Sequence, residues 1–589
     1  SIQNNEDISI NNYKAVSREW DKTFGTVSYH DYTGEAIQAS DGGYIIGGYA
    51  WGGINGDKTQ PGWGGTDYWL IKVDSNGNKL WDVDFGGTED DYLRSLQATS
   101  DGGCIAAGAS DSPISGTKSG AKIGGYDFWL VKINADGTKD WDITLGGGAD
   151  EELAEIRQTD DGGYIVGGSS ASGANGDKSE SSQGSNDYWI VKIDASGIKQ
   201  WDKRFGGPAS DIRHGIQQTP DHGFILGGVS YSGVGGNKTQ VNYGGADYWL
   251  VKINTDGVQE WDQTFGGESD DLLHSVITTP DGGFLAGGIS GSGISGNKSQ
   301  ANWGGVDFWA VKTNAVGMKE WDRTYGGSFD ERGEGEIHGV VNNFTDGGYL
   351  FACNSISQIT GTKTQTCYGY DDFWLLKTDA SGAKQWDVRL GGTGGDVLAS
   401  VAVTNDGGLL LAGKSGSDIS GDKTENLRGQ SDYWMLKTND GFLESLNCDI
   451  PPNGFTSKIK STSAKMNWDV VPTAQTYSVR YRKTGAVPWT KTTAQLNYKK
   501  LTGLLPNTQY DWAVKSVCDQ GSLSSDWSET KTFTTKPLRL ENDVEEIAFN
   551  VFPNPSAGVF TVDLTVNDEE TMQVKIEVLN LFGQIIHLD

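Results

Sequence analysis

Short runs of β-branched and aromatic residues, separated by glycine-containing turns, recur along most of the chain. Within residues 151–207, EELAEIRQT and YIVGGSS flank a DDGG turn, and DYWIVKID and IKQWDKRFGG flank an ASG turn. Hydrophobic runs around such turns predict β-hairpins. DYWIVKID is apolar on both faces except for one Lys, which is typical of a strand that is covered on both sides. Each stretch therefore predicts four antiparallel strands, with a long polar loop between the second and third.

This pattern repeats about every 60 residues, and three motifs occur seven times: a Trp-Asp pair, a D-[YF]-W triplet and a D-G-G turn (D-H-G once). The chain opens on a lone fourth strand, SREWDKTFG, and leaves the repeats on a lone third strand, DYWMLKT. These two strands complete one unit if the ends meet, whereas an open array would leave bare edges. A parallel β-helix has a much shorter repeat. We therefore predict an all-β fold with a seven-bladed β-propeller at 13–443, closed by an N-terminal strand, after a tail at 1–12.

Two charged positions are constant in the repeat. A Lys lies in every third strand, and pairing of Ile71 with Trp81 would place Lys72 beside Asp82 as an ion pair. An acidic residue opens every first strand, namely Asp31, Asp91, Glu151, Asp211, Asp271, Glu331 and Asp396. Because first strands are innermost in a propeller, these carboxylates can form a ring that takes a hard cation such as calcium. The favoured alternative is that each carboxylate caps backbone N–H groups of its loop, and no motif indicates a cofactor.

The long loops lie on one face of such a fold, where function usually resides. One loop position varies between units, and it and a neighbouring position supply the candidate ligand-binding aromatics Trp51, Trp63, Tyr243, Trp303 and Tyr368. Exposed Trp and Tyr side chains can stack on sugar rings or anchor a protein partner. The favoured alternative is that they pack between adjacent loops.

Charge and cysteine content narrow the class of protein. The net charge of −31 disfavours nucleic acid as a partner. The five Cys contain no CxxC motif, and two pairs within single modules, Cys353–Cys367 and Cys448–Cys518, are possible disulfides of an exported protein. No apolar run is long enough for a transmembrane helix. The chain starts at Ser1 without Met, so we expect that a signal peptide has been removed.

Catalytic motifs are missing from the sequence. No HExxH, GxSxG or Walker pattern occurs, and the six His follow no repeat position. Carboxylates are abundant, so a glycosidase remains an alternative, and the irregular segment ERGEGEIHGVVNNF at 331–344 is the first place to look for an active site.

Three resemblances add to this interpretation. The repeat WDKTFGG…DGGYIxGG…DYWLVKID resembles one found in surface proteins of Bacteroidetes, which carries no known activity. Residues 448–537 resemble a fibronectin type III domain, with Trp468 in a core strand and Tyr510 as the corner tyrosine that the resemblance implies. After a linker at 538–546, residues 547–589 resemble the front part of a type A sorting domain of type IX secretion cargo. Its signal residues are Pro553, Asn554, Pro555, Gly558 and Gly583.

The sorting-domain resemblance implies export across the outer membrane, with a translocon, an outer-membrane shuttle barrel and a sortase as partners. We therefore expect a secreted or cell-surface protein whose repeats bind glycan or protein without catalysis, in adhesion or gliding motility. A secreted glycan-active enzyme and a purely structural surface protein are the alternatives.

Overall fold

The computed structural model describes the greater part of the chain. The described residues are 18–27, 30–331, 340–341, 347–438, 451, 454–469, 471, 474, 476–494, 496–518, 523–525 and 527–538, with strands at 548–552, 561–565, 577–579 and 585–588. The chain divides into two compact units, Ser1–Ser445 and Leu446–Asp589, which are described separately.

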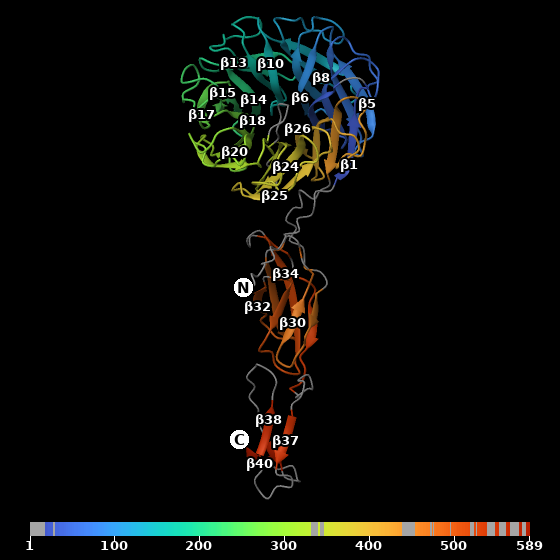
Figure 1. Cartoon of the computed structure of the whole chain (residues 1–589), viewed down its shortest axis with the longest axis vertical. Helices are drawn as coiled ribbons and strands as arrows, with labels where there is room; N and C mark the ends of the chain where they lie inside the picture. Colours follow the sequence, from blue (N-terminus) through green and yellow to red (C-terminus); the bar gives the residue numbers. More distant parts are fainter. Residues whose placement is uncertain are drawn as a thin grey trace. The chain divides into compact units, whose positions relative to one another are not determined.

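The first unit contains seven four-stranded antiparallel sheets, one for each sequence repeat (Figure 1). The first three sheets are β2 (Tyr32–Gln38), β3 (Tyr44–Trp51), β4 (Thr66–Val73) and β5 (Lys79–Phe85); β6 (Asp91–Ala98), β7 (Cys104–Ser110), β8 (Asp127–Ile133) and β9 (Lys139–Leu145); and β10 (Glu151–Gln158), β11 (Tyr164–Ser170), β12 (Asp187–Ile193) and β13 (Lys199–Phe205). The next two are β14 (Asp211–Gln218), β15 (Phe224–Ser230), β16 (Asp247–Ile253) and β17 (Gln259–Phe265); and β18 (Asp271–Thr278), β19 (Phe284–Ser290), β20 (Asp307–Thr313) and β21 (Lys319–Tyr325). The last two are β22 (Val340–Val341), β23 (Tyr349–Ser355), β24 (Asp372–Thr378) and β25 (Lys384–Leu390); and β26 (Asp396–Val403), β27 (Leu409–Ser415), β28 (Asp432–Thr438) and β1 (Arg18–Phe24).

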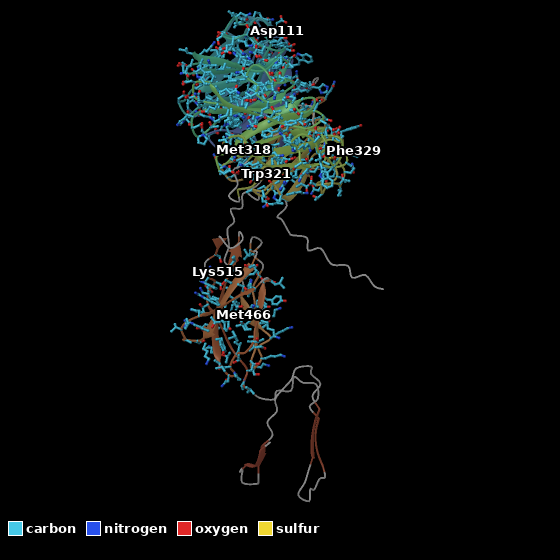
Figure 2. The ribbon with its side chains drawn as sticks, turned by 90° about the vertical axis from the view of Figure 1, so that its left-hand side faces the viewer. Asp111, Met318, Trp321, Phe329, Met466 and Lys515 are labelled. Atoms are coloured by element: carbon cyan, nitrogen blue, oxygen red, sulfur yellow. The ribbon has the colours of Figure 1, made fainter. Side chains whose placement is uncertain are left out.

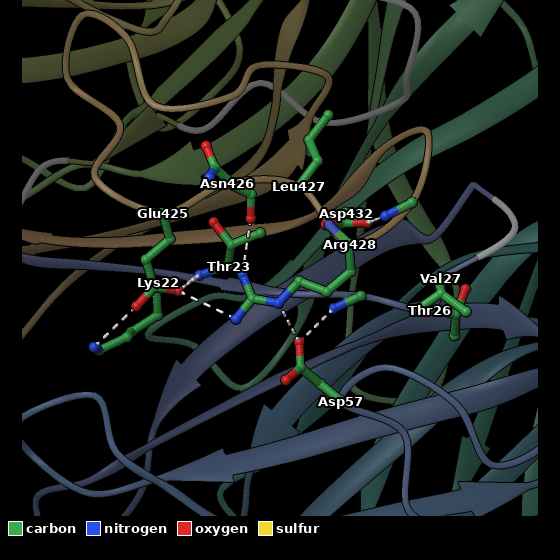
Figure 3. Close-up of polar contacts among 12 residues, drawn as sticks. Lys22, Thr23, Thr26, Val27, Asp57, Glu425, Asn426, Leu427, Arg428 and Asp432 are labelled. Atoms are coloured by element: carbon green, nitrogen blue, oxygen red, sulfur yellow. Dashed lines mark hydrogen bonds and ion pairs between the residues drawn. The ribbon is translucent and has the colours of Figure 1, made fainter.

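The two ends of the repeat region share one sheet. Strand β1 pairs antiparallel with β28, with Thr23 opposite Trp434, so the prediction that the lone end strands complete one unit is confirmed. A cluster of charges joins the last loop to the first repeat (Figure 3). Arg428 lies 3.0 Å from Asp57, and Lys22 lies 3.1 Å from Glu425.

The predicted fold class needs a correction. Backbone pairing ends at the fourth strand of every sheet in the first unit, and among the described residues no sheet closes or curls on itself. A seven-bladed propeller is therefore not supported, and the first unit is an all-β assembly of separate four-stranded sheets. The number of repeats predicted the number of sheets and strands. It carries no information on whether the sheets close into a propeller.

Neighbouring sheets are joined by aromatic side chains of the triplet motif. The Tyr68 ring lies 4.8 Å from that of Trp129 in the next sheet, and its hydroxyl donates to the Trp129 carbonyl oxygen at 3.0 Å. Tyr433 makes the same contacts with Trp69, at 5.1 Å between rings and 3.4 Å for the hydrogen bond. Each such pair buries large aromatic area and satisfies the phenol, so the triplet binds one sheet to the next.

The aspartate of each Trp-Asp pair organises its unit. Asp262 accepts from the Trp249 indole N–H at 3.0 Å and from the Thr239 backbone N–H at 3.0 Å. The same indole and loop contacts recur in the other six units, at Asp21, Asp82, Asp142, Asp202, Asp322 and Asp387. One carboxylate thus connects the fourth strand, the third-strand Trp and the long loop.

The predicted Lys72–Asp82 ion pair is wrong. Ile71 lies opposite Asp82, and Lys72 lies opposite Trp81, so the register differs by one residue from the expected pairing. Lys72 instead contacts Asp41 of the D-G-G turn at 2.6 Å. Equivalent pairs, between 2.8 and 2.9 Å, form at Lys132–Asp101, Lys192–Asp161, Lys252–Asp221, Lys312–Asp281 and Lys437–Asp406. The buried lysine therefore holds the first hairpin turn in place.

The second unit contains a β-sandwich and two strand pairs. One sheet of the sandwich is β29 (Phe455–Ser457), β30 (Ala464–Asn467) and β33 (Tyr498–Leu501), and the other is β31 (Thr476–Lys483), β32 (Thr490–Ala494), β34 (Gln509–Cys518), β35 (Leu523–Ser524) and β36 (Lys531–Thr534). Trp468 and Met466, the latter labelled in Figure 2, are buried in a core shared by both sheets. Tyr510 accepts from the Leu505 N–H at 2.9 Å, which is the corner contact expected of a fibronectin-type module. Strands β37 (Ala548–Phe552) and β38 (Thr561–Thr565) pair, as do β39 (Glu577–Leu579) and β40 (Ile585–Leu588).

We expect Asp262→Asn to lower the stability of the first unit by about 1–3 kcal/mol, because an amide cannot accept all the hydrogen bonds that converge on this carboxylate. Urea unfolding followed by Trp fluorescence measures the shift of the midpoint. Asp256→Asn, at an exposed turn position, removes the same charge and is the matched control. Equal midpoints for the two variants would contradict this role of Asp262.

Candidate functional site

The seven acidic residues that open the first strands cap their loops. The Asp91 carboxylate accepts from the Gly87 backbone N–H at 2.7 Å, and the other six accept from the equivalent amides at 2.6–2.9 Å. All seven side chains are buried. The favoured capping interpretation of Asp31, Asp91, Glu151, Asp211, Asp271, Glu331 and Asp396 is therefore confirmed. Within the described part of the chain, no group of three or more His, Cys, Asp or Glu side chains could hold a metal ion.

Burial makes several of these carboxylates hard to ionise, because it raises their pKa values. It raises the pKa of Asp31 to about 7, although hydrogen bonds from Thr26 oppose the rise. The pKa values of Asp91, Asp211 and Asp271 are raised for the same reason. These groups are structural acids buried inside the fold.

Four of the predicted aromatic residues pack individually between loops. Trp63, Tyr243, Trp303 and Tyr368 each lie on a glycine of the following loop, at Gly116, Gly296, Gly361 and Gly421. A Cβ on these glycines would come within 3.0 Å of the aromatic side chain, and their φ values of 55–59° also favour glycine. In the last unit Arg428 occupies the same position and contacts Asp57 of the first loop (Figure 3). This position is thus used for packing between loops, and it does not bring the four aromatics together.

Trp51 differs because it lies at a pocket with other aromatic residues. This aromatic pocket has a volume of about 330 Å³ and is lined by His30, Tyr32, Tyr49, Trp51, Thr66, Tyr92 and Arg94. Tyr32 lies opposite Tyr49 on adjacent strands, and their rings stack at 5.1 Å. Tyr92, from the next sheet, meets Tyr49 edge-on at 5.0 Å. Because Tyr49 and Trp51 are two residues apart on β3, they lie on the same face of the sheet.

The aromatic pocket is a departure from the repeat. The positions equivalent to Trp51 hold Asp111, Ala171, Tyr231, Gly291, Ile356 and Gly416, and those equivalent to Tyr49 hold Ala109, Ser169, Val229, Ile289, Asn354 and Lys414. Six other units therefore manage without an aromatic residue at the Tyr49 position, and five without one at the Trp51 position. The scaffold does not require these rings, which are concentrated in the first two repeats.

The groups at the aromatic pocket suit hydrogen bonding to a ligand. Trp51 is 47% exposed and Tyr32 is 37% exposed, so both present ring surface to solvent. Partial burial, with Asp90 nearby, raises the pKa of Tyr92 to about 12, so its phenol stays protonated at neutral pH, where it is hydrogen-bonded to Thr66 and Tyr126. Asp90 itself accepts from the Thr66 N–H and hydroxyl at 2.9 and 2.8 Å.

A second, polar cavity of about 470 Å³ lies where the first strands meet, with Glu35, Glu155 and Arg157 in its wall. Its acceptors serve the fold. Glu35 accepts from the Leu96 N–H at 2.9 Å, and Glu155 accepts from the Ile216 N–H at 2.5 Å. Arg157 forms ion pairs with both carboxylates. The two glutamates thus bind backbone N–H groups beside register shifts in the first strand of the next sheet. Their role in the cavity wall is therefore structural.

Of the other predicted residues, one cysteine pair is described by the structure and the rest lie outside the described residues. Cys353 and Cys367 are both free, so their predicted disulfide is wrong; the Cys367 thiol donates to the Ser355 carbonyl oxygen at 2.7 Å instead. Cys448 and the side chain of Cys518 lie outside the described residues, as do 332–339, 342–346 and the sorting-signal residues Pro553, Asn554, Pro555, Gly558 and Gly583.

Sequence reasoning missed His30, Tyr32, Tyr49, Tyr92 and Arg94 as pocket residues. They lie in or beside strands, where aromatic residues are expected in a core. A comparison of the repeats position by position could have found them. It separates the residues that the scaffold needs from those that it does not need.

We expect replacement of Asp31 by Asn to change the pH dependence of stability. The folded-state pKa is about 7 against an ordinary value of 3.8, so the folded protein holds this proton more tightly. The contribution is present in full below 3.8 and is lost as the pH rises through 7. The stability of the natural protein relative to D31N should therefore fall between these pH values, as thermal unfolding across pH would measure. A constant difference would show that Asp31 titrates normally.

Comparison with known proteins assigns the C-terminal segment. Residues 550–589 match the family described as the secretion system C-terminal sorting domain. The regulatory protein FlaEY of Caulobacter vibrioides is 24% identical over 290 residues, which is 45% of this chain and 28% of that protein. The chain thus spans less than a third of that relative's length.

Similar solved structures include the FN5 domain of Drosophila Lar, with 22% identity, 15% of this chain and 94% of that chain covered, and a TM-score of 0.13. They also include an fn3 domain of human contactin 1, with 21% identity, 15% of this chain and 80% of that chain covered, and a TM-score of 0.14. In the described residues, no helix has the length and apolar character to cross a membrane. The sorting domain at 550–589 identifies the protein as cargo of the type IX secretion system, exported across the outer membrane to the cell surface or the medium.

Proposed function

We propose that the first unit is a non-enzymatic glycan-binding module and that the aromatic pocket is its binding site. The observation that carries this proposal is the gathering of Trp51, Tyr32, Tyr49 and Tyr92 at one pocket, at repeat positions where most other units have small or aliphatic residues. Aromatic faces pack against the apolar faces of sugar rings, and phenols beside them can bond hydroxyl groups. The aromatic rings and the phenol groups together thus match both the apolar faces and the hydroxyl groups of a saccharide.

The size of the pocket supports a small ligand. A volume of about 330 Å³ lies at the lower end of the range for ligand pockets, roughly 300–1,000 Å³. Such a space accommodates one or two sugar rings of a longer chain. A flat protein interface would need a much larger contact surface.

The acidic groups near the pocket favour binding over hydrolysis. Asp90 is bonded to Thr66, and Asp31 is buried and bonded to Thr26. A glycosidase needs two carboxylates that face the scissile bond from opposite sides. Asp31 and Asp90 are instead hydrogen-bonded to neighbouring loop residues.

Export fixes where this binding takes place. The sorting domain implies interaction with the type IX secretion machinery. We propose that the translocon, an outer-membrane shuttle barrel and a sortase are the specific partners of this domain. The glycan would then be met at the cell surface or outside the cell.

We expect Trp51→Ala to weaken glycan binding at least about tenfold, because it removes the most exposed aromatic surface of the pocket. Ala171 occupies the equivalent position in the third repeat, so the scaffold accepts this residue. A glycan array, followed by calorimetry on the best ligands, measures the loss.

Trp63→Ala is the matched control. Trp63 is 43% exposed, close to the 47% of Trp51, but it packs on Gly116 outside the aromatic pocket. Equal loss in both variants would point to the loop face in general, and absence of binding by the natural protein to any glycan would overturn the proposal.

A further inference from the structure

We propose that the ligand of the aromatic pocket is an acidic sugar, with a carboxylate bound by Arg94 and attracted by Lys414. This inference rests on the proposed glycan-binding function and names the class of sugar. The juxtaposition that carries it is a pair of cations at an aromatic pocket in a strongly acidic protein.

Arg94 lines the aromatic pocket from the first strand of the second sheet. Its guanidinium carbon lies 5.9 Å from the centroid of the Tyr49 ring. The equivalent positions in the other described first strands hold Gly34, Ala154, His214, His274 and Ala399. The fold therefore does not need an arginine here, and the only guanidinium among these described positions stands at the aromatic pocket.

Lys414 approaches the same pocket from the other side of the junction between the last and first sheets. Its ammonium nitrogen lies 4.8 Å from the centroid of the Tyr32 ring. It occupies the repeat position of Tyr49, where the other units have neutral side chains. A second cation has thus been introduced at the rim of the pocket, again at a position that the scaffold leaves open.

The surroundings make these cations selective. The chain carries a net charge of −31, so most of its surface repels anions. The nearby carboxylates of Asp31 and Asp90 already accept hydrogen bonds from Thr26 and Thr66. Glu35 and Arg94 both line the adjoining polar cavity, and Glu35 accepts from the Ser95 hydroxyl and the Leu96 N–H. These acids are bonded within the protein, and Arg94 and Lys414 place two positive charges beside the Tyr49 and Tyr32 rings.

The chemistry of the ligand follows from this arrangement. A guanidinium binds a carboxylate through two parallel hydrogen bonds, a geometry that neutral sugars cannot offer. A uronic acid carries such a carboxylate at the edge of its ring, so the ring can lie on an aromatic face while the carboxylate reaches toward Arg94. The pocket is therefore expected to take uronate residues of an acidic polysaccharide.

Matched pairs of sugars test this inference on the whole protein. Oligomers of galacturonate and of glucuronate would be compared by calorimetry with the same oligomers after reduction of their carboxyl groups. We expect the acidic form to bind at least about tenfold more tightly, with an affinity that falls as salt rises. Arg94→Ala should remove this preference, so that the acidic and the reduced oligomers bind with equal affinity.

The repeats provide the controls. Alanine stands at this position as Ala154 and Ala399, so Arg94→Ala should fold with an unchanged melting temperature. Arg323→Ala in the fifth sheet removes the same charge from above another ring, at 5.9 Å from the Trp321 centroid, and should keep the preference.

The outcomes separate this inference from the proposed function. Equal binding of acidic and reduced oligomers, still dependent on Trp51, would overturn the acidic-sugar assignment and leave the glycan-binding function intact. A preference that survives Arg94→Ala would overturn the role of Arg94. Binding of neither form would overturn both proposals.

Discussion

The buried aspartate that follows the tryptophan in each repeat is the contact on which the first unit depends. Its carboxylate accepts from the indole of the third strand and from the backbone of the long loop, while belonging to the fourth strand itself. A charged acceptor in a buried place is favourable only when all its bonds are formed. Seven such carboxylates therefore fix seven loops relative to their sheets, and the pocket residues can vary on a frame that is already rigid.

Some positions hold the same type of residue in every repeat because the fold needs them, and this shows which of the other positions are free to vary. The triplet aromatics join neighbouring sheets, the D-G-G aspartates pair with strand lysines, and the first-strand acids cap the loops. Each of these positions is constant because a change would leave a buried group without its partner. The positions of Tyr49, Trp51 and Arg94 vary freely between units, so the fold does not require aromatic or cationic residues there.

The secretion signal and the binding pocket lie in different units of the chain. The sorting domain at 550–589 directs export, and the pocket belongs to the first two repeats. Nothing in the chemistry of the pocket depends on the secretion signal. The division would suit the proposed sequence of events, in which the protein is exported first and binds a ligand afterwards.

The sequence by itself determined the seven units and their strand order, because turn glycines and alternating apolar residues act locally. It also predicted the pairing of β1 with β28, because each end of the repeat region holds one incomplete unit. It also indicated the sorting domain through a short local motif. Only the tertiary structure decided the partner of Lys72, since a shift of one residue in register changes every cross-strand neighbour. It also decided against a closed sheet, left Cys353 and Cys367 free, and separated Trp51 from Trp63. Those outcomes depend on side-chain contacts between residues of different strands and loops. The spacing of residues along the chain does not determine such contacts.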